Sequence, residues 1–371
     1  MRRIAPIAVA LAALAGCGGD DGGIDSGLPA APTPQQLFLV RPLGPTGPLL
    51  GYDMPSARER FRLPAGVASA DGADFYAART HPRRTHVVAY DARTGSPRRS
   101  FDVPGRWKLA GVSPTGDWLA FAWSRRGETK VRVVEAATGK VASRIRLRGD
   151  FEVETVSADG SSMFLVEHLE RGAYRIRLYD LGNDVLAPGS LRAKGSDEIM
   201  AGYAWGGTAT PDGQWLLTLY LSTRRDTAFV HTLNLRNKFA LCLDLPSAGG
   251  EVAKLKAYGT ALSPDGTKLY AANPALGVVA ELDLVRGPTI RTVGTFEPTR
   301  RAGERTHVVV TRDGRWVYFS NGRAVWRHHV STGATQRMYA NGAAIAGLGL
   351  SGDGSRLFVA SAHGRPVAIA A

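Results

Sequence analysis

The chain has 371 residues, 44% of them hydrophobic, so it can bury a large core and is not an intrinsically disordered protein. Its formal net charge of +13 favours anionic neighbours over cationic ones. Its two cysteines, at positions 17 and 242, are too few for a disulfide framework.

The first sixteen residues have the layout of a secretory signal peptide. Arg2 and Arg3 precede an apolar stretch over 4–16 that ends in small residues. As a helix this stretch would be about 20 Å long, at ~1.5 Å per residue, whereas a bilayer core is ~30 Å thick. It is therefore too short for a transmembrane anchor, and its removal would leave a net charge of +11 (13 − 2).

Residues 14–17, with the sequence LAGC, resemble the bacterial lipobox, in which cleavage precedes the cysteine and diacylglycerol is joined to its sulfur. The resemblance implies lipidation of Cys17 and an extracytoplasmic protein that is lipid-anchored to the bacterial cell membrane. An ordinary signal peptide with a chance cysteine is the alternative. Residues 17–36, rich in Gly, Asp and Pro, predict a flexible tether.

The remaining residues, 37–371, contain no second low-complexity linker and are expected to form one domain. A turn followed by an apolar strand recurs seven times in them. The glycines of these turns are 44, 44, 53, 53, 48 and 40 residues apart: Gly72, Gly116, Gly160, Gly213, Gly266, Gly314 and Gly354. This is the period of a β-propeller blade, about 40–50 residues.

The residues around these turns predict antiparallel strands. Asp-Gly is a favoured tight turn between such strands, because glycine adopts positive φ without steric strain. The following strands, such as 215–221, are apolar on both faces, and later strands alternate, as in 174–179. We therefore expect an all-β fold, a single propeller of four-stranded antiparallel blades.

The repeat unit resembles the YVTN-type, WD-like repeats of bacterial propellers, a broad group of binding proteins and lactonase-like enzymes. The resemblance covers residues 37 to the end and rests on turn and strand positions. It implies a fold and says little about activity.

Seven blades are expected, with eight as the alternative. Residues 51–64 have the pattern of a third strand, a turn and a fourth strand, so the N-terminal segment is expected to complete the last blade and close the ring. Additional strand candidates at 37–41 and 366–370 support eight blades instead.

Propeller topology places the loops between second and third strands on the same face as the loops between blades. Arginine pairs in these loops predict a basic binding face for an anionic partner: Arg83, Arg84, Arg125, Arg126, Arg224, Arg225, Arg300 and Arg301. Solvated loop tips are the alternative.

Loops between blades also surround the central channel. They are expected to place acidic, basic and aromatic side chains at its mouth as candidate ligand-binding residues: Trp107, Glu154, Glu198, Trp205, Lys256, Tyr258, Arg305 and His307.

The sequence contains no HExxH, CxxC or GxSxG motif, and we expect no metal or cofactor. Cys242 is expected to be a packed small side chain. The favoured function is a monomeric binding or scaffolding module, whose partner is an anionic lipid, a cell-wall polymer or another envelope protein, and not nucleic acid. A lactonase-like hydrolase or a quinoprotein-type dehydrogenase, acting in the channel, is the alternative.

Overall fold

The structure is a computed structural model. It describes residues 37–40, 48–54, 56–125, 127–191, 200–222, 225–247, 252–285, 287–298, 306–340, 342–351, 353–361 and 365–371. The predicted signal peptide, Cys17 and the predicted tether therefore lie outside the described residues. No helix within the described ranges combines the length and apolar character needed to cross a membrane.

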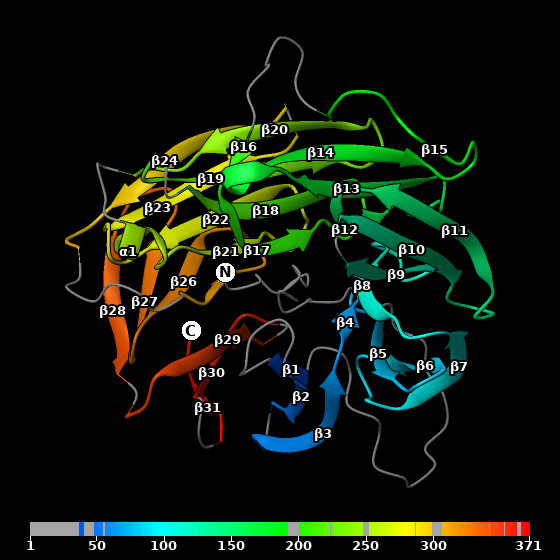
Figure 1. The fold of residues 1–371 in the computed structure, drawn as a ribbon. Helices are drawn as coiled ribbons and strands as arrows, with labels where there is room; N and C mark the ends of the chain where they lie inside the picture. Colours follow the sequence, from blue (N-terminus) through cyan, green and yellow to red (C-terminus); the bar gives the residue numbers. More distant parts are fainter. Residues whose placement is uncertain are drawn as a thin grey trace, which may run out of the picture.

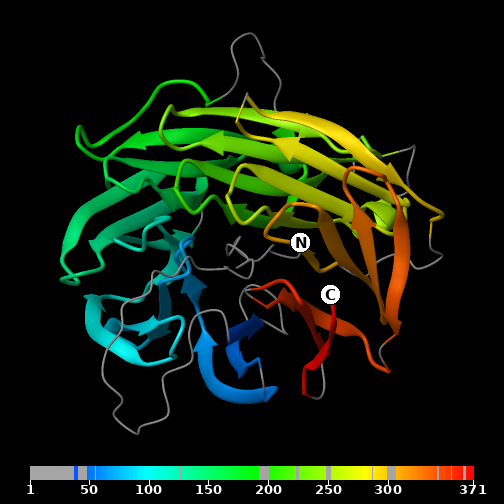
Figure 2. The same ribbon diagram turned by 180° about the vertical axis from the view of Figure 1, so that it is seen from behind.

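The described chain forms eight antiparallel sheets, arranged in sequence order around a central axis (Figures 1 and 2). The first sheet contains β1 (Leu37–Val40), β2 (Pro48–Asp53) and β3 (Arg58–Ala65). The second contains β4 (Val67–Ala68), β5 (Asp74–Thr80), β6 (Arg84–Asp91) and β7 (Pro97–Pro104). The third contains β8 (Lys108–Val112), β9 (Trp118–Arg125), β10 (Glu128–Glu135) and β11 (Val141–Arg148).

The fourth and fifth sheets occupy the middle of the chain. The fourth contains β12 (Asp150–Val156), β13 (Ser162–His168), β14 (Ala173–Asp180) and β15 (Val185–Leu186), and β16 (Met200–Ala201) also pairs with β14. The fifth contains β17 (Tyr203–Ala209), β18 (Trp215–Ser222), β19 (Thr227–Asn234) and β20 (Phe239–Asp244). Within the described ranges two short helices accompany the strands, η2 (Glu170–Gly172) and α1 (Val252–Leu255).

The last three sheets complete the propeller. The sixth contains β21 (Gly259–Leu262), β22 (Lys268–Asn273), β23 (Val278–Asp283) and β24 (Thr289–Thr295). The seventh contains β25 (Val308–Val310), β26 (Trp316–Asn321), β27 (Ala324–His329) and β28 (Thr335–Ala340). The eighth contains β29 (Ile345–Leu350), β30 (Arg356–Ser361) and β31 (Val367–Ala370).

The all-β propeller with four-stranded antiparallel blades is confirmed, but the prediction of seven blades is wrong, because the structure has eight. The predicted blade made from both chain ends is not found in the described residues. Strands β1–β3 form one three-stranded sheet and β29–β31 another. The candidates at 37–41 and 366–370, which supported eight blades, correspond to β1 and β31.

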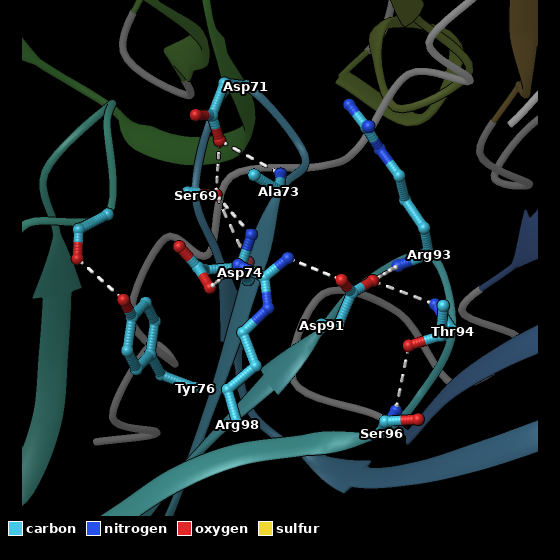
Figure 3. Close-up of polar contacts among 11 residues, drawn as sticks. Ser69, Asp71, Ala73, Asp74, Tyr76, Asp91, Arg93, Thr94, Ser96 and Arg98 are labelled. Atoms are coloured by element: carbon cyan, nitrogen blue, oxygen red, sulfur yellow. Dashed lines mark hydrogen bonds and ion pairs between the residues drawn. The ribbon is translucent and has the colours of Figure 1, made fainter.

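The repeated turn explains why the sequence suggested seven blades. In six sheets a Ser or Thr hydroxyl donates to the aspartate two residues later and accepts from the backbone N–H five residues later. Figure 3 shows one example, in which Ser69 donates to Asp71 at 2.5 Å and accepts from the N–H of Asp74 at 3.0 Å. The third sheet keeps the serine and glycine but has Thr115 in place of the aspartate. Residues 41–47, between β1 and β2, contain no Asp-Gly pair, so the first blade carries no such signal.

Apolar side chains fill the spaces between neighbouring sheets. Between the first and last sheets, Phe38 and Phe358 belong to one buried cluster with ring centroids 6.0 Å apart. On the other side of the first sheet, Leu49 and Leu63 pack with Phe75 of β5. The joint between the chain ends is therefore made by side-chain packing between two separate sheets.

Candidate binding surface

The arginine pairs predicted in the loops are only partly within the described residues. Arg83, Arg84, Arg125 and Arg225 are described and exposed. The other four, Arg126, Arg224, Arg300 and Arg301, lie outside the described residues. The described members lie at the connections between second and third strands of the second, third and fifth sheets.

Arg84 has an acidic neighbour on its own sheet. Its guanidinium contacts Asp102 at 3.0 Å, and His86 Nδ1 contacts the other carboxylate oxygen of Asp102 at 2.8 Å. These contacts, the bond to His86 first, lower the pKa of Asp102 even though burial acts in the opposite direction. Part of the positive charge of Arg84 is therefore already balanced within the second sheet.

Arg125 belongs to a larger group of cations on the outer strands of the third sheet. Strand pairing places Arg125 opposite Glu128 and Glu128 opposite Arg148. Residues directly opposite in an antiparallel sheet, and alternate residues along a strand, point to the same side. One side of β9–β11 therefore carries six cationic residues, which we call the blade-3 basic face: Arg125, Lys130, Arg132, Arg144, Arg146 and Arg148.

Like charges stand directly opposite each other on this face. Arg132 is paired with Arg144, and Lys130 with Arg146. Such pairs destabilise a sheet, whereas opposite charges in the same positions would stabilise it. Burial and the charge of Arg144 both lower the pKa of the Arg132 guanidinium.

Glu128 is the acid on this side of the three strands, and its charge offsets a small part of the positive charge. It forms an ion pair with Arg146, and its other carboxylate oxygen lies 3.4 Å from Lys130 Nζ. Burial opposes ionisation of Glu128, but the bond to Arg146 and the charges of Arg146 and Lys130 lower its pKa overall. This side of β9–β11 thus carries six cationic side chains and one carboxylate.

Two tryptophans support the inner part of the blade-3 basic face. The Arg132 guanidinium lies 4.6 Å from the ring centre of Trp107, and Lys130 Nζ lies 5.0 Å from that of Trp123. The Trp107 indole N–H donates to the carbonyl of Pro104 at 2.8 Å, which fixes the ring. Trp107, predicted at the channel mouth, therefore lies beneath a cation of the third sheet.

Of the other described candidates for the channel mouth, Trp205 packs against the buried cluster that contains Tyr258. Trp205 is on β17, Tyr258 is fully buried and bonds to the carbonyl of Pro246, and Lys256 follows α1. The backbone N–H of His307 donates to Ser320 Oγ at 2.8 Å. Glu198 and Arg305 are outside the described residues.

Glu154 is the one of these candidates with an unusual environment. It occupies a bulge in β12, where the pairing shifts between Val153 and Thr155, and its side chain is 7% exposed. Oε1 accepts a bond from Thr218 Oγ1 of β18 at 3.3 Å, and no partner for the buried Oε2 is found in the described part of the chain. Burial, with a contribution from Glu152, raises the pKa of Glu154 to about 7.

Sequence reasoning found Arg125 but missed the rest of the blade-3 basic face, because it concentrated on loops. A signal was available in the strand VASRIRLR, where arginines recur at every second position, 144, 146 and 148. Alternation of this kind puts all three on one side of a strand.

Comparison with known proteins supports the fold. No protein-family model matches the chain, and a search of curated protein sequences finds no match. Among solved structures, the Dos1 propeller covers 90% of this chain and 88% of its own, with 14% identity and a TM-score of 0.51. The dihydro-haem d1 dehydrogenase NirN, in complex with DHE, covers 92% and 76%, with 17% identity and a TM-score of 0.50. At these identities the likeness is one of fold alone.

Proposed function

We propose that this protein is an exported, membrane-tethered binding or scaffolding module, and that an anionic polymer of the cell envelope docks on the blade-3 basic face. The observation that carries the proposal is the direct pairing of Arg132 with Arg144 and of Lys130 with Arg146. An arrangement that weakens the free sheet becomes favourable when a bound anion lies between the like charges.

The spacing of the cations suits an extended partner. Alternate residues on a strand are about 7 Å apart, at ~3.4 Å per residue, so Arg144, Arg146 and Arg148 form a regular row. Guanidinium groups bind phosphate or carboxylate with two parallel hydrogen bonds. A linear polymer with regularly spaced anionic groups could therefore contact several arginines at once.

The tether is the second part of the proposal, and the sequence supports it. The basic start, the short apolar segment and Cys17 predict export and lipidation, and 17–36 would hold the propeller close to the membrane. Replacement of Cys17 by Ser tests this part. We expect the variant to leave the membrane fraction, and a Cys17→Ser protein that remains in the membrane would contradict the lipid anchor.

The basic face is tested with inorganic polyphosphate as the probe, by fluorescence anisotropy at low salt. The triple variant Arg144→Glu, Arg146→Glu, Arg148→Glu should bind at least tenfold more weakly than the wild type. The matched control reverses Arg58, Arg60 and Arg62, three exposed arginines of β3 that form no one-sided row, because the pairing with β2 shifts at Arg60. Both triples change the net charge equally, so an equal loss in the two would show that only overall charge matters and would refute a local site.

The class of partner is then separated by two further measurements. Binding to purified cell-wall polymer and binding to vesicles of anionic phospholipid are each compared with binding to neutral vesicles. Both the wild type and the triple variant at Arg144, Arg146 and Arg148, here called the β11 variant, are measured. Binding to the polymer that depends on β11 supports the proposal, whereas β11-dependent binding to vesicles alone would identify lipid headgroups instead. The fold shared with NirN and the Dos1 propeller assigns no activity, because propellers serve many functions.

A further inference from the structure

We propose that Met200, His231 and Cys242 form a binding site for a soft monovalent metal ion, Cu(I) or Ag(I), between the fourth and fifth sheets. This site is independent of the blade-3 basic face. It rests on the juxtaposition of a thiol, a thioether and an imidazole nitrogen from three different strands.

The three side chains meet at the thiol of Cys242. Its Sγ lies 3.5 Å from Met200 Sδ and 3.5 Å from His231 Nδ1. Met200 belongs to β16, which pairs with β14 of the fourth sheet. His231 and Cys242 are cross-strand partners on β19 and β20 of the fifth sheet. The packing of two sheets therefore brings together three ligands that are distant in the sequence.

The distances suit a shared ion. Metal–sulfur bonds of about 2.3 Å and metal–nitrogen bonds of about 2.0–2.1 Å place ligand atoms roughly 3.5–4 Å apart around one centre. Both separations from Cys242 Sγ are at the lower end of this range, so an ion that joins the thiol to either neighbour requires only small movements of those side chains. As a hydrogen-bond donor the thiol is weak and can serve only one of its two neighbours at a time.

The imidazole is prepared for this role by its surroundings. His231 is 1% exposed, and burial lowers its pKa to about 4, so the ring is neutral and keeps a nitrogen lone pair. It lies edge-on to Tyr220 with ring centroids 6.0 Å apart, which restricts its orientation. Its Nε2 is buried with no hydrogen-bond partner in the described residues, so the polar contact of the ring is the one between Nδ1 and the Cys242 thiol.

The choice of ion follows from the ligands. Thiolate and thioether sulfur select soft ions such as Cu(I), whereas harder ions prefer carboxylates. Within the described ranges no group of three or more His, Cys, Asp and Glu side chains is placed to hold a metal, so Met200 is needed as the third ligand. Cys242 as a residue lies at the surface, which gives an ion access from solvent, while its thiol is directed at Met200 and the buried His231.

The charge balance is that of simple ligand exchange. Burial and then the carboxylate of Asp244 raise the pKa of the Cys242 thiol to about 12, while Arg225 lowers it slightly. The thiol is therefore protonated in the absence of an ion. Binding of one Cu(I) forms the copper–sulfur bond and releases the thiol proton, with no change in oxidation state.

The experiment is an anaerobic titration of the full chain with Cu(I) against a competing chelator. We expect one ion per chain, one proton released per ion and a sulfur-to-copper charge-transfer band. Cys242→Ser should abolish this binding, and Met200→Leu and His231→Gln should each weaken it at least tenfold. Cys17 is unchanged in every variant, so the difference between variants belongs to Cys242 and its neighbours.

Met338→Leu is the matched control, because Met338 is a partly buried methionine on the outer strand β28, and it should bind as the wild type does. X-ray absorption spectroscopy of the wild type should show two sulfur ligands and one nitrogen ligand around the ion. This measurement tests the ligand set even if His231→Gln folds poorly. Wild-type affinity in Met200→Leu, a single sulfur in the spectrum, or no binding by the wild type would each overturn the proposal.

Discussion

Phe38 of the first sheet packs against Phe358 of the last, with ring centroids 6.0 Å apart and ring planes inclined by 31°. Phe38 is also so close to Gly349 of β29 that a Cβ at that glycine would overlap its ring. One aromatic side chain thus contacts two strands of the neighbouring sheet. This contact lies within the buried cluster that joins the two sheets at the chain ends.

Replacement of Phe38 by Ala should therefore lower the free energy of unfolding by about 3–5 kcal/mol, the usual range for a buried Phe→Ala substitution. Urea unfolding followed by tryptophan fluorescence measures the change. Val285→Ala is the control, because Val285 is 69% exposed and its truncation should change stability by less than about 0.5 kcal/mol. Equal effects of the two substitutions would show that Phe38 does not support the seam.

Removal of one cation from the blade-3 basic face should stabilise the free protein. Arg144→Gln relieves the repulsion with Arg132 and should raise the free energy of unfolding by about 0.5 kcal/mol at low salt. The gain should disappear in 1 M salt, where screening acts over about 3 Å. The same variant should bind polyphosphate more weakly, so stability and binding should change in opposite directions. A loss of stability at low salt would contradict the repulsion.

Glu154 should make stability depend on pH. Burial raises its pKa in the folded protein to about 7, from an ordinary value of 4.5, so between these pH values the folded state holds more protons than the unfolded state. Its contribution is present below pH 4.5 and is lost as pH rises through 7, by about 3 kcal/mol at ~1.4 kcal/mol per pKa unit.

Glu154→Gln keeps the bond with Thr218 and cannot ionise, so the variant should unfold at a higher denaturant concentration than the wild type at pH 8 and lose this part of the pH dependence. Denaturant midpoints measured from pH 4 to 8 give the comparison. If the denaturant midpoint of the wild type instead rises between pH 5 and 8 in parallel with that of the variant, Glu154 is charged in the folded protein throughout this range.

The turn glycines differ in what surrounds them, and two substitutions separate conformation from contact. Gly160 and Gly354 have φ values of +69° and +70°, but a Cβ at Gly160 would overlap the Trp118 ring, whereas nothing lies within 4 Å of one at Gly354. Gly354→Ala should cost about 1–2 kcal/mol from backbone conformation. Gly160→Ala should cost a further ~1–3 kcal/mol from the steric overlap. Thermal unfolding of both variants tests this, and equal losses of stability would show that the Trp118 side chain moves aside without an energetic cost.

The turns were predicted from the sequence because their chemistry is local. A Ser or Thr, an Asp and a Gly within four residues form the same hydrogen bonds in six sheets, so the pattern is visible without knowledge of packing. The number of blades was not predicted correctly, because the first blade has a different connection between β1 and β2 and β1 has only four residues.

The sites depend on pairing between strands, which the sequence does not display. Arg132 meets Arg144 through the register of β10 and β11, and Met200 meets Cys242 only because β16 pairs with the fourth sheet next to β20. Glu154 was selected as a channel residue, but its burial against Thr218 follows from a bulge. Contacts between neighbouring sheets therefore required the structure.

The independence of the first and last sheets also bears on how such a ring can change over generations. Because the seam between the chain ends is made by side chains such as Phe38 and Phe358, no backbone hydrogen bond of the described strands ties the number of repeats to the position of the termini. Duplication or loss of a whole repeat would leave the strand pairing of every remaining sheet intact, so the adjustment would fall on the side-chain packing between sheets. A change in the number of blades by gene duplication or deletion is thus compatible with this architecture, in contrast to rings that are closed by one sheet built from both ends of the chain.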